Sequence, residues 1–460
     1  MSARKNTAIS IAAAVIAVGL AACSGGGSNP GSGATATDTT GATANTATAA
    51  NPAATGPAQA AADPNYTAKL TVWENNTNGT RGPQFWVDTV AAYQQIHPNV
   101  TLDIVPVQNE DMDGKLQTAL NGGVGPDMFF QRGGGWLSAE VEAGFVADLS
   151  GAVNAPDIPD SAFAAHTLDG KRYALPMTIL PGGFFYAKDL FAQAGIADTP
   201  KTLDDLNQAV TKLKAAGIAP IALGAKDAWP AAHWYYWFAL RECSQDTLAT
   251  ASTSADLSDP CFLKAATDLK AFADTKPFND GFLTTSAQVG AGSSAGLVAN
   301  HKAAMELMGA WDPGVIGTLT PDAHNLPDLD FFPFPSVPGG QGDPSAMMAG
   351  VDAFSCSAGA PEPACTDFLN YLGSAQVQTA YAAANSAIPA STAAASAVSD
   401  PILQTVMSYN QKAAYVSLWL DTRLGNNIGN ALNSGVVDLL AANGTPQGII
   451  DAANQAAQKG

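Results

Sequence analysis

Aromatic rings and acidic or amide side chains recur together along this chain. The candidate ring planes are Trp73, Trp136, Trp229, Trp311 and Trp419. The candidate edge groups are Glu74, Asn76, Asp127, Gln131, Asp227, Asp312, Asp352, Asp421 and Arg423. Tryptophan rings stack on apolar CH faces, and carboxylates accept charge-assisted hydrogen bonds from neutral hydroxyl groups. A ligand with both kinds of surface is a carbohydrate, so these residue types favour sugar binding.

Each candidate also has a purely structural interpretation. Trp311 is the strongest ring candidate because it lies between an expected strand and a proline, although tryptophan is also common in cores. Trp229 stands just before an expected helix start, where its ring can face a cleft. Asp421 and Arg423 are equally well explained as a surface ion pair. A structural role is also open for Asp127 and for Asp352.

The sequence contains no complete catalytic, metal-binding or cofactor-binding motif. Residues 292–296 have the pattern of an esterase nucleophile elbow, but the residues before them do not form the strand that an elbow requires. Residues 109–114 begin like a calcium loop, yet its twelfth position is Leu120 and lacks the bidentate carboxylate. No Cys-x-x-Cys pair occurs and the histidines are scattered. We therefore expect no catalytic residue, no metal and no cofactor.

Length and charge limit the possible classes of protein. A chain of 460 residues is too long for one ordinary core and predicts two domains with additional segments. Hydrophobic residues make up 47% of the chain, so a sizeable core can form. The formal net charge of −19 argues against nucleic-acid binding, which requires lysine and arginine at the phosphates.

The first 65 residues read as an export signal and a tether. A basic start is followed by an apolar run at residues 8–22, which is short for a membrane span, and by Leu-Ala-Ala-Cys at residues 20–23. This pattern predicts a signal peptide at residues 1–22 and lipidation of Cys23, which would anchor the protein at the outer face of the cytoplasmic membrane. An ordinary cleaved signal is the alternative. Residues 23–65 are rich in Ala, Thr and Gly and predict a disordered tether.

The remaining cysteines predict disulfides. Cys243, Cys261, Cys356 and Cys365 are an even number in an exported protein, and three pairings are possible. We favour Cys243 with Cys261 and Cys356 with Cys365, because each pair closes a short loop. Reduced thiols are the alternative.

Strand and helix patterns alternate at the start of the ordered region. Strands are expected at residues 70–73, 100–107 and 128–130, and helices at residues 85–96 and 115–120. This alternation predicts a parallel sheet, in which ligands bind beyond the carboxyl ends of the strands. We therefore expect one ligand-binding edge of the sheet to contain residues 73–76, Asp127 and the loop at residues 131–136.

The middle of the chain, from residue 173 to residue 241, is expected to pass from one lobe to another. Its apolar run is interrupted by Pro176, Pro181 and the pair Gly182-Gly183, which argues against one uninterrupted strand and for a bend between two sheets. Beyond it, Thr202 opens a near capping box before a helical stripe, and a strand follows at residues 220–223.

The rest of the chain is expected to continue a second α/β lobe and to pass between the two lobes twice more. Helices are expected at residues 262–273, 288–300, 361–372 and 375–384 and across the tail from residue 402, with extended segments at residues 303–308 and 346–354. Proline and glycine at residues 331–340 predict a second crossing. Residues 388–389 are expected to be a third.

Several short motifs, in this order, resemble the extracellular carbohydrate-binding proteins of ABC importers, the family that includes the maltose-binding protein. The motifs lie at residues 125–127, 173–176, 185–191, 194–196, 200–203, 216–224 and 303–313. The resemblance implies an α/β, two-lobed periplasmic-binding-protein fold (type II, Venus-flytrap) with several hinge crossings. It places a sugar-stacking tryptophan at Trp311 and another aromatic at Trp419. We expect residues 66–179 and about 340–387 in the N-terminal lobe, and residues 180–339 and about 388–460 in the C-terminal lobe.

The resemblance implies that the protein binds a neutral sugar and releases it without a chemical reaction. The partners would be the transmembrane permease subunits of an ABC importer with a cytoplasmic ATPase, and the protein would act as a monomer. Several tryptophans favour a short oligosaccharide. A secreted glycoside hydrolase, which would need two carboxylates at fixed separation, and a surface lipoprotein without a transport role are the alternatives.

Overall fold

A computed structural model describes residues 65–75 and 81–459. Asn76, Cys23, the expected signal peptide and nearly all of the expected tether lie outside these ranges. Within the described ranges, no helix combines the length and the apolar character needed to cross a membrane.

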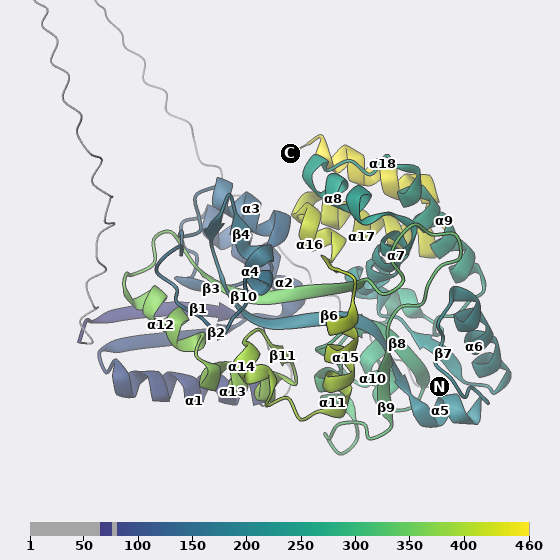
Figure 1. Cartoon of the computed structure of the whole chain (residues 1–460), viewed down its shortest axis with the longest axis horizontal. Helices are drawn as coiled ribbons and strands as arrows, with labels where there is room; N and C mark the ends of the chain where they lie inside the picture. The colour runs from purple at the N-terminus through teal and green to yellow at the C-terminus, as the bar shows by residue number, and fades with distance from the viewer. Residues whose placement is uncertain (1–64, 76–80, 460) are drawn as a thin grey trace, which may run out of the picture. The chain divides into compact units, whose positions relative to one another are not determined.

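One mixed sheet runs through the described chain (Figure 1). Its strands follow the order β2 (Val100–Pro106), β1 (Ala68–Glu74), β3 (Met128–Gln131), β10 (Met347–Cys356), β6 (Leu175–Ala187), β8 (Ala303–Gly309) and β7 (Ala219–Ala222). The strands β9 (Leu329–Phe332) and β11 (Ile388–Pro389) pair with β6, and β12 (Val416–Leu418) pairs with β10. The strands β4 (Thr167–Leu168) and β5 (Lys171–Arg172) form a separate pair.

The parallel pairing predicted for the strands at residues 70–73, 100–107 and 128–130 is confirmed at one end of the sheet, and the pairing at the other end is parallel as well. Strand β1 pairs in parallel with β2 and β3, and β7 pairs in parallel with β8. In the middle, β10 and β6 are antiparallel to each other, and β3 and β8 pair antiparallel with them. The sheet as a whole is mixed, because β6 and β10 run in opposite directions between two halves of the molecule.

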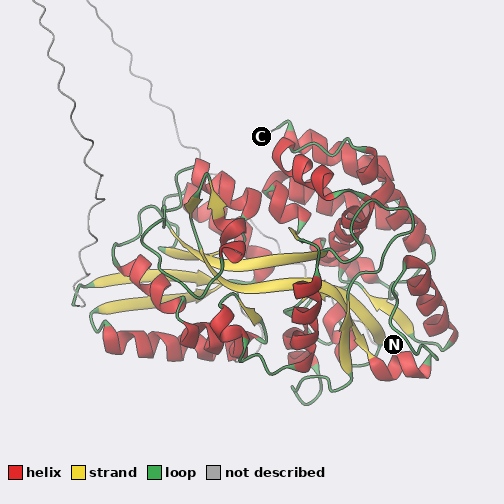
Figure 2. Ribbon diagram, viewed as in Figure 1, coloured by secondary structure: helices red, strands yellow, loops and turns green. Residues whose placement is uncertain are grey.

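Helices cover the sheet at both ends (Figure 2). Around β1, β2 and β3 the helices are α1 (Arg81–Ile96), α2 (Asn109–Asn121), α3 (Gly134–Glu142), α4 (Asp160–Phe163), α12 (Ala364–Leu372), α13 (Ala375–Asn385) and α14 (Thr392–Ala395). Around β7 and β8 they are α5 (Lys188–Gln193), α6 (Leu203–Ala215), α7 (Trp229–Glu242), α8 (Gln245–Ser254), α9 (Pro260–Asp274), α10 (Ser294–Ala299), α11 (Asp312–Leu319), α15 (Pro401–Lys412), α16 (Leu420–Leu424), α17 (Asn426–Leu440) and α18 (Pro446–Ala457). Single 3-10 turns lie at η1 (Ala164–His166), η2 (Ala225–Asp227) and η3 (Phe282–Thr284).

Two large hydrophobic cores divide these elements into lobes. The first core contains Met177 of β6 and Phe354 of β10, together with the rings of α1 and α12. The second contains Phe184 of β6 and Met348 of β10, together with the aromatic face of α7. Each of these two strands therefore leaves one core and enters the other. We call the elements of these cores the first lobe and the second lobe; the lobe boundaries given above stay predictions.

The expectation of a broken strand at residues 176–183 was wrong, because β6 is continuous. Pro176 lies at a register shift against β10, and Pro181 is the last β6 residue paired with β10 before Gly182 pairs with β8. The missing N–H groups of the prolines thus fall where pairing is irregular or changes partner. The glycines provide space: a Cβ on Gly182 would lie 2.5 Å from the Trp419 ring, and one on Gly183 2.4 Å from the Phe331 ring.

Other local predictions had mixed outcomes. The capping box is present, with Thr202 Oγ1 accepting from the Asp205 N–H and the Asp205 carboxylate accepting from the Thr202 N–H. Both favoured disulfides are bonded, Cys243 with Cys261 and Cys356 with Cys365. The helix expected at residues 288–300 is shorter, since Ser293 caps α10 and the residues before it form a loop. The tail is helical except at β12.

Candidate ligand-binding site

A cavity of about 950 Å³ lies between the two lobes and is lined by side chains of both. Thr178 of β6 and Asp352 of β10 line its middle. The strands that join the lobes thus contribute directly to the cavity wall. A movement of one lobe relative to the other would therefore change the cavity's shape.

The second lobe supplies an aromatic wall. The rings of Trp229, His233, Trp311 and Trp419 all line the cavity. His233 stacks on Trp419 with 4.2 Å between ring centroids, and Trp229 lies 5.1 Å from His233 and 6.0 Å from Trp311. Trp419 is only 6% exposed, whereas Trp229 and Trp311 are half-buried. The two half-buried rings are consequently the available stacking planes.

Glycine sets the position of Trp311. A Cβ on Gly309 would lie 1.9 Å from the Trp311 ring, so the indole rests on the backbone at the end of β8. The indole N–H groups of Trp311 and Trp229 have no hydrogen-bond partner among the described residues. Both nitrogens are buried, so a ligand in the cavity would meet the faces of these rings and not their N–H groups.

His233 was not among the residues predicted for the site. Its imidazole is buried, and burial lowers its pKa to about 3. The ring is therefore neutral at physiological pH, and its flat face stacks on Trp419. The dense aromatic run at residues 229–238 was visible in the sequence, but the sequence alone did not tell which face of α7 points to the cavity.

Asp352 provides an available carboxylate opposite this wall. It is half-buried and lines the cavity, and its carboxylate makes no hydrogen bond with the described residues. Burial raises its pKa to about 6, and the positive charge of Arg132 opposes that rise. An anionic acceptor without a donor partner is ready for a ligand hydroxyl.

Two other predicted carboxylates line the cavity, and each accepts a hydrogen bond from a backbone N–H. Asp421 accepts from the Thr422 N–H at 2.7 Å, and burial raises its pKa. Asp227 accepts from the Ala287 N–H at 2.7 Å and so connects two loops of the second lobe. Trp136 also lies at the cavity.

Arg132 is a cavity residue that sequence reasoning missed. Its Nε donates to both carboxylate oxygens of Asp113 at 3.1 Å, and its Nη2 donates to Asn109 Oδ1 at 3.0 Å. It directly follows β3, so the rule that placed the loop at residues 131–136 at the mouth also covers it.

Four predicted residues of the first lobe lie elsewhere. Asp127 precedes β3 and accepts from the Thr71 N–H at 2.7 Å, so it stands at the wrong end of the strand. Gln131 bonds to Glu140 and accepts from the Gly133 N–H, which fixes the turn after β3. Trp73 packs against the first-lobe cores, and Glu74 is 2% exposed. None of the four is among the residues that line the cavity.

Two predicted residues of the second lobe also stand away from the cavity lining. Arg423 Nη1 donates to Ser417 Oγ at 3.1 Å, and no ion pair joins it to Asp421 in the described chain. Asp312 is fully buried behind Trp311, and neither of its carboxyl oxygens has a hydrogen-bond partner among the described residues. Its pKa is raised by burial to about 8. The binding role of every predicted residue stays a prediction.

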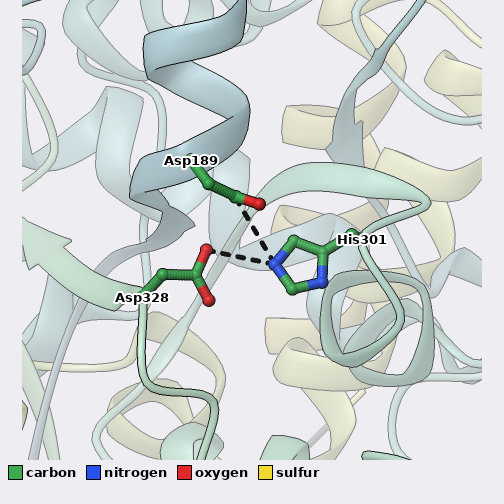
Figure 3. Close-up of side chains that lie close together, drawn as sticks. All are labelled: Asp189, His301 and Asp328. Carbon is green, nitrogen blue, oxygen red and sulfur yellow. Dashed lines mark hydrogen bonds and ion pairs between the residues drawn. The ribbon is translucent and has the colours of Figure 1, made fainter.

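His301 of the second lobe lies beside two carboxylates. Its Nε2 lies 3.0 Å from Asp328 Oδ2 and 3.4 Å from Asp189 Oδ1, so the ring bridges two carboxylates (Figure 3). The three side chains belong to the second lobe and do not line the cavity. In these contacts one imidazole nitrogen lies close to two carboxylates, and we assign no metal to the group.

Comparison with known families decides the class of the protein. The family described as bacterial extracellular solute-binding protein matches residues 76–379. The chain belongs to this family. Its two-lobed architecture agrees, because solved structures of the same fold superpose on most of the chain.

Individual relatives of this solute-binding protein are distant. A binding protein of Brucella abortus is 30% identical over 196 residues, which are 42% of this chain and 47% of that protein, so the chain matches about half the length of this relative. The diacetylchitobiose binding protein DasA of Streptomyces coelicolor is 28% identical over 40% of this chain and 41% of its own. An extracellular-binding protein of an uncharacterized ABC transporter of Pyrococcus horikoshii is 23% identical over 67% of this chain and 69% of its own.

Solved structures match more of the chain. A structure from work on xylan utilization by Caldanaerobius polysaccharolyticus is 25% identical, has a TM-score of 0.77, and covers 85% of this chain and 99% of its own. A chitin oligosaccharide binding protein is 21% identical, with a TM-score of 0.77 and coverage of 85% and 98%. The two-lobed fold of this solute-binding protein is thereby confirmed.

Proposed function

We propose that this solute-binding protein captures a short, neutral oligosaccharide in the cavity and releases it unaltered to an ABC import permease. The observation that carries the proposal is the aromatic wall of Trp229 and Trp311 with the partner-free carboxylate of Asp352 in the same cavity. Stacking planes and an anionic acceptor match the two surfaces of a sugar ring. No step in this function breaks a bond, so the protein would not be an enzyme.

The size of the cavity and the names of the relatives support more than one sugar ring. The volume lies at the upper end of the range typical for small-ligand pockets. Relatives are named for diacetylchitobiose and for chitin oligosaccharides, and one structure comes from work on xylan utilization. Beta-linked disaccharides such as xylobiose and cellobiose are our first candidates.

The remaining parts of the proposal concern location and partners. Lipidation of Cys23 would hold a monomer at the outer face of the cytoplasmic membrane, where transmembrane permease subunits driven by a cytoplasmic ATPase receive the ligand. Two acyl chains suffice for stable anchoring. Metabolic labelling with a fatty acid, lost in Cys23→Ser, is the expected sign of this modification.

A thermal-shift panel tests the proposed function. The full chain is heated with 1 mM xylobiose, cellobiose, N,N′-diacetylchitobiose, maltose, or their monosaccharides. A ligand at about 100 times its Kd stabilises the folded state by about 2.7 kcal/mol, so we expect the melting temperature to rise by several degrees for one disaccharide class. No shift with any sugar would contradict sugar binding. Release of monosaccharides during incubation would instead indicate a hydrolase.

Binding should weaken in acid through Asp352. The pKa of this carboxyl is about 6, so at pH 5 only about a tenth of the molecules carry the anionic acceptor. We expect affinity for the stabilising sugar to be about tenfold lower at pH 5 than at pH 8. Calorimetric titrations at the two pH values measure it. Asp352→Asn should bind weakly and equally at both, and an unchanged pH dependence in that variant would exclude Asp352 as the cause.

A further inference from the structure

The lobes meet at a turn built from three glycines. Residues 133–135 of the first lobe are all glycine, and the turn leads into α3. A Cβ on Gly134 would lie 2.5 Å from the carbonyl oxygen of Thr422, and one on Gly135 would lie 2.6 Å from the backbone N of Gly425. Both contacts are with the second lobe. Backbone therefore meets backbone across the lobes, at a distance that leaves no room for a side chain.

The contact lies at the rim of the cavity. Arg132 precedes the glycine turn directly, Asp421 precedes Thr422 directly, and both charged residues line the cavity. The positive charge of Arg132 acts to lower the pKa of Asp421, so the two side chains attract each other across the lobes. Beside them, Asn426 Nδ2 of α17 donates to Gln117 Oε1 of α2 at 3.2 Å.

The second-lobe side of the contact also reaches the strands that join the lobes. Trp419 lies three residues before Thr422, and its ring is packed on the backbone of β6 and β10. A Cβ on Gly182 would lie 2.5 Å from this ring, and one on Gly350 would lie 3.1 Å from its Nε1. Residues 419–425 thus contact the joining strands at one end and the glycine turn at the other.

We propose that the glycine turn at residues 133–135 and residues 422–425 form a closure seam, which fixes the lobes in the arrangement that completes the cavity. The proposal rests on the proposed function only in that ligand binding would favour the closed arrangement. In the seam, backbone atoms of one lobe contact backbone atoms of the other, and few side-chain hydrogen bonds join them. The seam can therefore open and form again. Because it has no spare volume, one added methyl group holds the lobes apart. The seam glycines are positioning residues and need not touch the ligand.

Crosslinking across the seam tests the proposal without a known ligand. Gln117→Cys and Asn426→Cys are placed together in the full chain, with Cys23→Ser in every variant. A short bismaleimide then joins the two thiols only when the lobes are close. We expect rapid intramolecular crosslinking in this parent protein. Adding Gly135→Ala should lower the crosslinking rate at least tenfold.

The controls separate the seam from general damage. Gly359→Ala is the matched control, because a Cβ there meets no atom within 4 Å, and it should crosslink like the parent. Gly134→Ala, whose Cβ would meet Thr422, is a second variant in case Gly135→Ala fails to fold, and circular dichroism checks each one. Because Gly134 has a φ of +60°, its control is Gly123→Ala, which has a φ of +67° and no atom within 4 Å of a Cβ. Equal crosslinking in Gly135→Ala and Gly359→Ala, or none in the parent, would overturn the seam. A sugar that stabilises the protein should accelerate crosslinking in the parent; if no sugar does, the proposed function fails while the seam result stands.

Discussion

Replacing Asp312 by asparagine should remove roughly 3–4 kcal/mol of the stability that the protein loses between pH 5 and pH 8. Asp312 is fully buried behind Trp311, and burial raises the pKa of its carboxyl to about 8. Glu306 of β8 is also buried; it accepts from Ser294 Oγ, and the charge of Asp312 adds to the effect of burial in raising the pKa of Glu306 well above its usual value. The two acids thus retain protons in the folded state at neutral pH.

The sign of the effect follows from proton binding. An unfolded aspartate has a pKa near 4, so between about pH 4 and pH 8 the folded chain binds more protons at Asp312 than the unfolded chain does. The stability contribution is complete below pH 4 and is lost as pH rises through the folded pKa. One extra proton corresponds to at most about 1.4 kcal/mol per pH unit, or roughly 3–4 kcal/mol from pH 5 to pH 8. Asparagine keeps the shape and cannot ionise, so this loss should disappear.

Urea unfolding at pH 5 and pH 8 measures the difference. Asp204→Asn in the first turn of α6 is the control, because it makes the same substitution at an exposed aspartate. The Asp312→Asn variant should gain stability relative to the parent as pH rises. Parallel pH profiles for parent and Asp312→Asn would show that Asp312 is ionised in the folded protein.

Replacing Trp311 by alanine should weaken sugar binding by about 30- to 200-fold while the protein stays folded. The ring is half-buried, and roughly 100 Å² of a tryptophan's surface is then available to a ligand. At about 25 cal/mol per Å² this contact contributes about 2–3 kcal/mol to binding.

Titration calorimetry with the stabilising sugar, together with melting temperatures, tests the Trp311 prediction. Trp311→Phe keeps a stacking plane and should retain most of the affinity. Trp73→Phe alters a tryptophan that packs in the first lobe away from the cavity, so it should change stability but not affinity. If Trp311→Ala binds as tightly as the parent, Trp311 does not contact the ligand.

The sequence located much of the cavity because strand ends are recognisable. Trp311 follows β8, Trp229 is the first residue of α7, and both line the cavity. Asp127 failed for a directional reason: it stands before β3 rather than after it. Gln131 stands at the right end, but its side chain is used to hold the turn of Gly133.

The parts that the sequence did not predict depend on contacts between distant residues. Pro181 and Gly182 look like strand breakers until β10 and β8 supply partners on either side of them. The same glycine provides the space for Trp419, which lies far along the chain. Similarly, the sequence places the three glycines at residues 133–135 in a loop. Their close contact with the backbone of residues 422–425 is known only from the structure.

Isothermal titration calorimetry of the full chain with the disaccharide that raises its melting temperature most is the most direct measurement of whether the cavity holds a sugar. We expect one molecule to bind per chain, with heat that saturates, and the sugar to be recovered intact from the calorimeter. No binding heat with any sugar of the panel, or recovery of cleaved sugar, would contradict it.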